Sequence, residues 1–178
     1  KATEMIQKNI RDSHHDFTGI IHLYANCFGR GDAAQLIDNK ETEAYFSRAI
    51  AEGGTCATYS DNNKTIAALL YFPARLHTHF PPEIIHLVHD KSIYIAELMV
   101  DTDFRGRGLA RKLLHNLLND FPEHDFLIRV WRKNEAALQL YLKTGFTEVA
   151  TITETKTKPD GNTLFEMEKV YLHFRNNK

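Results

Sequence analysis

The stretch AELMVDTDFRGRGLARKLLHNLL, Ala96–Leu118, passes from an apolar run through an acidic turn and two glycines into an amphipathic run. The apolar part is typical of a strand, and leucines recur at helical spacing in the amphipathic part. Together with the apolar segment DFLIRVW they predict strand Ile93–Val100, a helix from about Arg105 to Asn119, and strand Asp125–Trp131. A strand–helix–strand unit of this length places the two strands parallel, with a right-handed crossover.

The turn between that strand and helix is a candidate ligand site. Ligands collect at the carboxyl ends of strands in open α/β sheets, and a helix start exposes unpaired backbone N–H groups. Gly106 and Gly108 remove side chains where an anion would approach, and Arg105 and Arg107 add positive charge. The turn therefore predicts a phosphate or pyrophosphate site. The alternative is a turn with surface arginines and no ligand, because glycine turns are common.

Other phosphate-binding motifs fit this turn less well. A dinucleotide fingerprint needs a third glycine three residues after Gly108, where Arg111 stands, and a P-loop needs a Gly-Lys-Ser/Thr ending that the turn lacks. An RNA-binding segment rich in arginine and glycine would be disordered, whereas this turn continues into an amphipathic helix.

Size and composition favour one globular domain. The chain has 178 residues, a formal net charge of -1 and 43% hydrophobic residues, which fits one domain over residues 1–178. A near-neutral charge gives no global attraction to nucleic acid or to an anionic membrane. No apolar run approaches the roughly 20 residues that span a bilayer, and the polar start lacks a signal peptide, so we expect a cytoplasmic protein. Cys27 and Cys56 lack a surrounding motif and are expected to be buried free thiols.

The remaining segments predict a mixed β-sheet with helices packed on it. The expected fold class is α/β, with an α+β mixed sheet. The hairpin turn is Asp61–Asn63, and the turn of the final antiparallel pair is Lys158–Asn162. The expected elements are strand 3–10, helices 16–28 and 39–52, a hairpin over 55–73, helix 134–145, and strands 146–157 and 163–174.

A second polar constellation lies in RVWRKNEAALQLYLKTGF, residues 129–146. Asn134 suits a helix N-cap, and Tyr141 lies two helical turns later, so both project on about the same face. The alternative is that Asn134 only caps the helix and Tyr141 belongs to the core.

The two segments together closely resemble the GNAT superfamily of N-acetyltransferases. VDTDFRGRGLA matches that family's acetyl-CoA signature at Arg105, Gly108 and Ala110, between a strand and a helix. The second segment is similar to the family's second cofactor motif, a strand followed by an Asn, a helical Tyr and Gly-Phe. The resemblance implies the GNAT fold, with a central mixed sheet whose two parallel strands splay apart to admit the pantetheine arm.

The resemblance also implies which residues bind acetyl-CoA, the expected co-substrate. Backbone groups from Arg105 to Ala110 would hold the pyrophosphate, the backbone from Leu98 to Val100 would pair with the acetyl carbonyl and pantetheine, and Asn134 would contact the cofactor arm. The full expected set is Leu98, Met99, Val100, Arg105, Gly106, Arg107, Gly108, Leu109, Ala110 and Asn134.

Two residues are candidates for the chemistry. Tyr141 is expected to act as general acid through a hydrogen bond that strengthens as the thiolate forms. Glu97 is the only acid within the central strand and by alternation shares a face with Ile93, Ile95 and Met99, which would raise its pKa. It is a candidate base, acting directly or through water, or a contact for the substrate's ammonium group. The alternative is a buried acid paired with a neighbouring Arg, His or Tyr.

The histidine-rich segment Pro73–Ser92 is expected to be a surface excursion with one short helix. His77 with His79 and His86 with His89 have spacings that zinc ligands use, but no cysteine or carboxylate completes a ligand set, so no metal is expected. A loop bordering a rigid scaffold usually carries specificity, so we expect this segment to cover the amine side of the site.

The sequence thus predicts an N-acetyltransferase that moves an acetyl group from acetyl-CoA to a primary amine by direct attack in a ternary complex. The acceptor is a small-molecule or peptide amine, and neither nucleic acid nor a membrane is an expected partner. Alternatives are a non-catalytic acyl-CoA-binding sensor and nucleic-acid binding through Arg105–Lys112. The chain is expected to be a monomer or a homodimer, with the tail YLHFRNNK either serving a dimer or completing the core.

Overall fold

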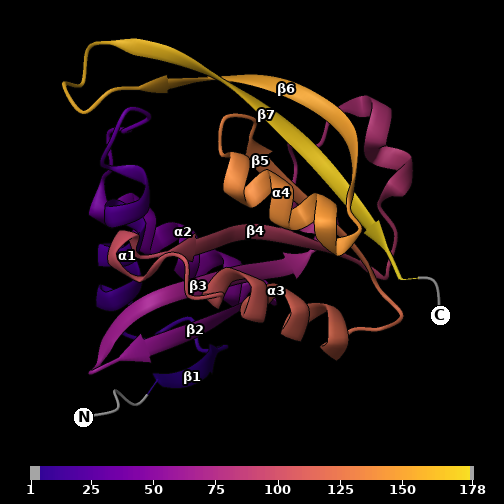
Figure 1. The fold of residues 1–178 in the computed structure, drawn as a ribbon, viewed down its shortest axis with the longest axis horizontal. Coiled ribbons are helices and arrows are strands. Elements are labelled where there is room, and N and C mark those ends of the chain that lie inside the picture. Colours follow the sequence, from indigo (N-terminus) through magenta and orange to yellow (C-terminus); the bar gives the residue numbers. More distant parts are fainter. Residues whose placement is uncertain (1–4, 177–178) are drawn as a thin grey trace.

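The computed structural model describes residues 5–176, so Thr3 and Glu4 of the predicted first strand and the last two residues of the tail lie outside it. The labelled helices and strands of Figure 1 follow the expected order. Three short 3-10 helices, η1–η3, lie in the connections between them. They are β1 (Met5–Ile10), α1 (Thr18–Phe28), α2 (Asn39–Ala51), β2 (Thr55–Asp61), β3 (Lys64–Pro73), η1 (Ala74–Leu76), η2 (Pro82–Leu87), β4 (Ser92–Val100), η3 (Thr102–Phe104), α3 (Leu109–Asp120), β5 (Asp125–Trp131), α4 (Glu135–Thr144), β6 (Thr147–Thr157) and β7 (Leu164–Arg175).

The strands form one seven-stranded sheet in the order β1-β2-β3-β4-β5-β7-β6. Only β4 and β5 are parallel, and all other neighbours in the sheet are antiparallel. The predicted mixed sheet and its parallel central pair are therefore confirmed. Within the described residues, no helix is long and apolar enough to cross a membrane.

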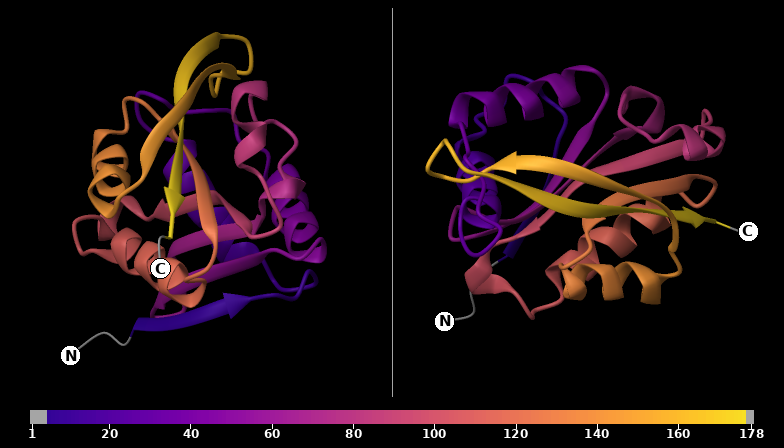
Figure 2. Two further views of the ribbon diagram at one scale, coloured as in Figure 1. Left: turned by 90° about the vertical axis from the view of Figure 1, so that its right-hand side faces the viewer. Right: turned by 90° about the horizontal axis from the view of Figure 1, so that it is seen from above.

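Helices cover both faces of this sheet, and each face has its own core (Figure 2). On the first, the α3 face, the leucine stripe of α3 packs with Leu138 of α4 against strand residues. On the second, the α1 face, Ile20 and Leu23 of α1 and Phe46 of α2 pack against the same strands. The last strand, β7, contributes to both cores. Tyr171 belongs to the core on the α1 face and Leu172 to the core on the α3 face, and neither has exposed surface. Those two tail residues therefore complete the core of the chain.

Helix α3 begins at Leu109, so the predicted start near Arg105 is wrong. Gly106 and Gly108 have φ angles of 79° and 76°, in the left-handed region that a right-handed helix excludes. The preceding residues instead form η3, and Asp101 accepts a hydrogen bond from the N–H of Asp103. The glycines thus hold an irregular turn between strand and helix.

Helix α4 has the predicted ends. Oδ1 of Asn134 accepts a hydrogen bond from the backbone N–H of Ala137 at 3.3 Å, so Asn134 is the N-cap. Gly145 follows the helix with a φ of 116° and ends it in the left-handed conformation. The N-cap prediction is confirmed.

The parallel strands separate halfway along their length. Cα partners run from the pair Ser92 and Asp125 to the pair Ile95 and Ile128, whereas β4 continues to Val100 and β5 to Trp131. The backbone of β4 beyond Ile95 therefore faces a gap on its β5 side. This is the splay that the family resemblance implied.

A β-bulge changes which face Glu97 occupies. Leu70 of β3 pairs with Glu97, but the next residue, Tyr71, pairs with Ile95, so Ala96 is an extra residue in β4. Alternation is interrupted there, and Ile95 lies on the α3 face while Met99 lies on the α1 face. Glu97 shares its face with Met99 only, so the predicted common face with Ile93 and Ile95 is wrong.

The histidine-rich segment forms two 3-10 helices, η1 and η2, where one short helix was predicted. The ring of His77 stacks on Tyr94 with centroids 4.0 Å apart, and its Nε2 lies 3.0 Å from the hydroxyl of Tyr171. Burial lowers the pKa of His77 to about 3, so this imidazole is neutral. The segment is thus packed onto the α1 face.

Candidate active site

The gap between β4 and β5 opens into a cavity of about 850 Å³, the central cavity. It is lined from both faces of the sheet, because the separated strands no longer close the layer between them. Its walls come from α1 and the following connection, β4, the turn before α3, β5, α4, β6 and β7. A ligand in the central cavity can therefore contact groups from both layers of helices.

Most of the residues expected to act together do border this cavity. Neither Met99 nor Arg107 is among the described residues that line it: Met99 is buried in the α1-face core, and the guanidinium of Arg107 lies over the ring of Phe104 at 4.8 Å. The expected residues that line the central cavity are Glu97, Leu98, Val100, Arg105, Gly106, Gly108, Leu109, Ala110, Asn134 and Tyr141.

The turn before α3 has the geometry of an anion cradle. A Cβ atom added to Gly106 or Gly108 would meet nothing within 4 Å, so open space lies beside both glycines. The first N–H groups of α3 adjoin this turn and precede the earliest intrahelical bond, which joins the N–H of Lys112 to the carbonyl of Gly108. Nε of Arg105 donates to the carbonyl of Val100 at 3.3 Å, which holds this charge beside the turn. The donors present fit a pyrophosphate group.

Glu97 reaches the central cavity from the α1 face. Its Oε1 lies 3.4 Å from the hydroxyl of Tyr45 in α2. Burial raises the pKa of Glu97 to about 7, against the lowering influence of Lys169, Arg129 and the Tyr45 hydroxyl. The carboxyl group is therefore close to half protonated at neutral pH. The alternative for Glu97 was a buried acid paired with a neighbouring Arg, His or Tyr, and Tyr45 is such a partner. Glu97 nevertheless borders the central cavity.

Tyr141 reaches the same cavity from the α3 face, where it is 4% exposed and packs in the core. Burial raises its pKa, and the charge of Glu97 raises it further. Its hydroxyl is therefore protonated at neutral pH and available as a donor. The splay places this donor and the carboxyl of Glu97 on opposite sides of one cavity.

The two cysteines differ in position. Cys56 has no exposed surface, as predicted, but Cys27 is only partly buried and lines the central cavity. Sγ of Cys27 donates to the carbonyl of Val100 at 3.3 Å. Burial raises the pKa of Cys27 to about 11, so this thiol is protonated and a poor nucleophile at neutral pH.

Several cavity residues escaped the sequence analysis. Three cations, Arg129, Lys156 and Lys169, line the central cavity from β5, β6 and β7. Their signal is a basic residue inside an otherwise apolar strand, as in DFLIRVW, but nothing in the sequence says that three strands turn them toward one point. Tyr24, which lines the cavity, and Tyr45, which contacts Glu97 without lining the cavity, were also missed. Aromatic residues on amphipathic helices usually belong to the core.

None of the residues of Pro73–Ser92 lines the central cavity, so the structure gives no support to the prediction that this segment covers the amine side. Residues 29–38, the α1–α2 connection, instead contribute Arg30, Asp32, Ala33 and Gln35 to the cavity wall. Its position is fixed by a hydrogen bond of 2.8 Å from the N–H of Leu36 to the carbonyl of Thr157 in β6.

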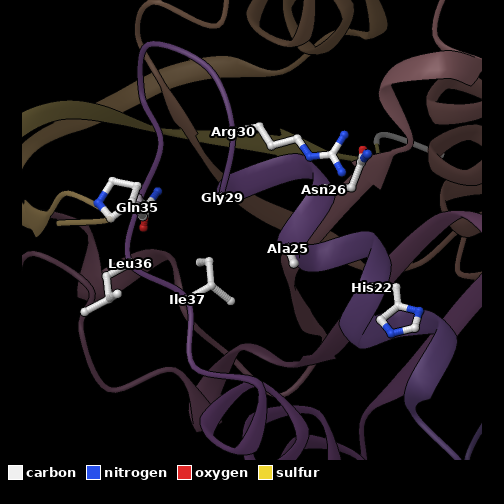
Figure 3. A pocket seen from close by; sticks show the side chains of 9 residues that line it. His22, Ala25, Asn26, Gly29, Arg30, Gln35, Leu36 and Ile37 are labelled. Carbon is white, nitrogen blue, oxygen red and sulfur yellow. The ribbon is translucent and has the colours of Figure 1, made fainter. Parts of the chain in front are cut away.

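A second pocket, of about 500 Å³, lies on the other side of this connection (Figure 3). Arg30 and Gln35 line both pockets, and Figure 3 shows Arg30 extending beside Asn26. Oδ1 of Asn26 accepts a hydrogen bond from the N–H of Thr102 at 3.1 Å, so this amide ties α1 to η3. Asn26 of the second pocket therefore has a structural role.

A sequence model of the family described as "Acetyltransferase (GNAT) family" matches residues 17–146. This span contains the cradle, Glu97 and Tyr141. The chain belongs to the GNAT acetyltransferase family. A comparison with curated protein sequences finds no match.

Solved structures of GNAT proteins share this fold across nearly the whole chain. An N-acetyltransferase from Staphylococcus aureus Mu50 has a TM-score of 0.71 at 17% identity, covering 98% of this chain and 99% of its own. The structure of yncA from Salmonella typhimurium, which includes its cofactor acetyl-CoA, has a TM-score of 0.69 at 17% identity, covering 98% and 95%. A ribosomal-protein-alanine N-acetyltransferase from Brucella melitensis has a TM-score of 0.68 at 17% identity, covering 96% and 99%. The predicted GNAT-type fold is thereby confirmed.

Proposed function

We propose that this GNAT protein forms a single N-acetyltransferase domain that moves an acetyl group from acetyl-CoA to a primary amine by direct attack in a ternary complex. One observation carries the proposal: a cavity through the splayed sheet has an anion cradle at one end, with Glu97 and Tyr141 on opposite walls. The acceptor is a small-molecule or peptide amine, and no metal is required.

Binding of acetyl-CoA is assigned to the cradle and the free edge of β4. The backbone N–H groups from Arg105 to Ala110 bind the pyrophosphate, with Arg105 contributing its charge. The backbone of Leu98 to Val100, which lacks a β5 partner, pairs with the pantetheine arm, and Asn134 contacts the arm from α4. Met99 takes part through its backbone alone, because its side chain is in the core.

Glu97 serves as the base for the acceptor. A lysine-like amine with a pKa near 10.4 costs about 4.6 kcal/mol to deprotonate at pH 7, and an α-amino group near 8 costs about 1.4 kcal/mol. A carboxyl group with a pKa of about 7 is well matched to this transfer, directly or through one water molecule. We therefore expect Glu97 to increase the reaction rate more for the more basic amine.

Tyr141 serves as the hydrogen-bond donor to the departing sulfur. Acetyl-CoA supplies an activated thioester and a thiol leaving group. A thiol with a pKa of about 8.5 is more acidic than a phenol of about 10, so complete transfer of the tyrosine proton is uphill. A hydrogen bond that strengthens as negative charge develops on sulfur needs no such transfer. The protonated, buried hydroxyl of Tyr141 suits this role.

Direct attack is favoured over an acyl-enzyme intermediate on a cysteine. Cys27 borders the cavity, but its pKa of about 11 and its bond to the carbonyl of Val100 leave little thiolate. Cys56 is fully buried. Neither thiol is poised to accept the acetyl group.

The test is thiol release from acetyl-CoA across a library of primary amines, run with wild type, Tyr141→Phe and Tyr59→Phe. Tyr59 packs against the α3-face core outside the central cavity and controls for loss of a buried-face hydroxyl. We expect Tyr141→Phe to lower kcat roughly a hundredfold without a comparable loss of acetyl-CoA affinity, and Tyr59→Phe to match wild type. Acetyl-CoA binding with no turnover on any amine would instead support the acyl-CoA sensor.

A further inference from the structure

The acceptor side of the central cavity carries a dense group of positive charges. Arg129, Lys156 and Lys169 converge on one carboxylate, Glu154, with N···O distances of 3.3, 3.1 and 2.9 Å. We refer to these three cations and Glu154 as the basic cluster. The three cations line the central cavity, and their side chains are 23%, 27% and 15% exposed, so they are largely shielded from solvent.

The basic cluster has more positive than negative charge. Within the described residues, Glu154 is the one carboxylate within ion-pair distance of Arg129, Lys156 or Lys169. Of the other acids that line the central cavity in residues 5–176, Glu97 has its pKa raised to about 7 by burial, and Asp32 and Glu135 make no ion pair with the three cations. The three cations also repel one another. Burial lowers the pKa of Lys169, and the charges of Arg129 and Lys156 lower it further. Partly buried cations in such excess are stabilised by an anion that enters the cavity.

The cluster lies on the side where the acceptor must enter. Arg129 follows Leu127 by alternation on β5, and Lys169 precedes Tyr171 on β7, so both lie on the α1 face with Glu97. The cradle and α4 lie toward the α3 face. An anion bound at the basic cluster is therefore separate from the pyrophosphate site, and it lies beside the proposed base.

The α1–α2 connection limits the size of this acceptor. It is tied to the end of β6 through Leu36 and Thr157, and Nε2 of Gln35 lies 3.9 Å from Sδ of Met167 in β7. Figure 1 shows the connection approaching the end of the long β6–β7 hairpin, and residues of both line the central cavity. A compact amine fits this space better than an amine displayed on a folded protein.

From this arrangement we infer that the acceptor is a small amine that itself bears an anionic group, a carboxylate or phosphonate, bound by Lys156, Lys169 and Arg129 while its amino group faces Glu97. The inference rests on the proposed acetyltransferase function and names its substrate class. It assigns Lys156 and Lys169 as specificity-determining residues, because each has Glu154 as its one ion-pair partner among residues 5–176.

The first experiment compares matched acceptors. Thiol release from acetyl-CoA is measured with glycine, L-alanine, L-leucine, L-phenylalanine and 2-aminoethylphosphonate, and with the α-amide of each amino acid and ethylamine as uncharged partners. The amine of an α-amide is less basic than the amine of the amino acid, so a larger fraction of it is unprotonated. This difference alone would favour turnover of the amide. We expect kcat/KM to be at least tenfold higher for the anionic member of the best pair. Equal or better turnover of the uncharged members would overturn the inference and leave the acetyltransferase function standing.

Three variants then test the basic cluster. Lys156→Met and Lys169→Met should each reduce the preference for the anionic acceptor by tenfold or more, chiefly through KM. Glu154→Gln removes the neutralising charge and should increase that preference. Lys91→Met is the control, since Lys91 pairs with Glu123 on the surface and both side chains are exposed. A preference unchanged in both lysine variants would contradict the assignment.

A binding measurement separates the two proposals. Calorimetric titration of the wild type and Lys169→Met with N-acetyl-L-leucine and N-acetyl-L-leucinamide needs no turnover, because both are products. We expect the acid to bind at least tenfold more tightly to wild type, and the difference to shrink in the variant. If no amine is acetylated, this result still supports the anion site while the acetyltransferase proposal fails. Equal binding of acid and amide, or no binding of either, overturns the anion site.

Discussion

The hydroxyl of Tyr45 lies 3.4 Å from Oε1 of Glu97, so α2 and β4 meet at the carboxyl group proposed as the base. This contact depends on the bulge at Ala96, which turns Glu97 toward the α1 face. The hydroxyl favours the ionised carboxylate and lowers the pKa that burial raises. Tyr45 thereby helps to hold the pKa of Glu97 near 7.

Tyr45→Phe should shift the acid limb of the pH profile of kcat/KM to higher pH. The base must be ionised to accept a proton, so activity rises as the pH passes through the pKa of Glu97. Loss of the hydrogen bond raises that pKa, and we expect an upward shift of about half a unit to one unit, less than a short hydrogen bond to a charged group gives because the two oxygens are 3.4 Å apart. The measurement is kcat/KM from pH 5.5 to 9 at saturating acetyl-CoA.

Glu97→Gln and Tyr59→Phe complete this comparison. Glu97→Gln should remove the acid limb assigned to the base, whereas Tyr59→Phe should leave it in place, because Tyr59 does not line the central cavity. If Glu97→Gln kept both the wild-type pH profile and the wild-type amine affinity, neither functional role of Glu97 would stand.

Glu154→Gln should destabilise the fold at neutral pH. The cations around Glu154 lower its pKa to about 2, against burial, which acts to raise it. A depressed acid pKa contributes stability above the unfolded value of 4.5, and that contribution is lost as the pH falls toward 2. We expect the variant to lose roughly 2 to 3 kcal/mol in the free energy of unfolding at pH 7, measured by urea denaturation. This loss should become smaller as the pH is lowered from 7 to 3.

The matched control for Glu154→Gln is Glu123→Gln. Glu123 pairs with Lys91 at 3.4 Å, but its side chain is 78% exposed, and such pairs contribute little. Its loss should change the free energy of unfolding by less than about 0.5 kcal/mol at either pH. Equal losses in the two variants would mean that the basic cluster stabilises no more than a surface pair.

The sequence predicted the elements whose signal is local. The leucine periodicity of α3, the Asn134 cap and the Gly145 end of α4 each follow from side chains within a few residues of the element. The parallel pair followed from the length of one connection. The cradle followed from two glycines and two arginines, although Arg107 stacks on Phe104 and does not face the cavity.

Features that depend on pairing between distant segments were missed. The bulge at Ala96 comes from the register of β3 against β4, and no local pattern in β4 marks it. The basic cluster joins three strands that are neighbours only in the folded sheet. The α1–α2 connection contributes to the cavity wall, and the hydrogen bond of Leu36 to Thr157 joins it to a residue more than a hundred positions later in the chain. Each of these features places side chains around the central cavity.

Gly108→Ala should weaken acetyl-CoA binding by more than its effect on stability. An alanine at a φ of 76° costs roughly 1 to 2 kcal/mol of backbone strain. Because the added methyl would also occupy the open space of the cradle, we expect at least a tenfold increase in the Kd of acetyl-CoA, measured by calorimetry.

Gly161→Ala is the control for that strain. Gly161 has a φ of 77° with nothing within 4 Å of an added Cβ, and it lies in the β6–β7 turn away from the central cavity. It should lose similar stability with an unchanged Kd for acetyl-CoA. A similar rise in Kd in both variants would show that Gly108 acts through strain alone and not through the cradle.

Asn134→Ala should reduce both stability and acetyl-CoA affinity, because its side chain caps α4 and borders the central cavity. Loss of an N-cap costs about 1 kcal/mol in the free energy of unfolding. Asp38→Ala is the matched variant, since Asp38 caps α2 through the N–H groups of Lys40 and Glu41 and does not line the cavity. Thermal unfolding should fall comparably in both, while the Kd of acetyl-CoA should rise severalfold in Asn134→Ala alone. An unchanged Kd in that variant would reduce Asn134 to a helix cap and remove it from the cofactor site.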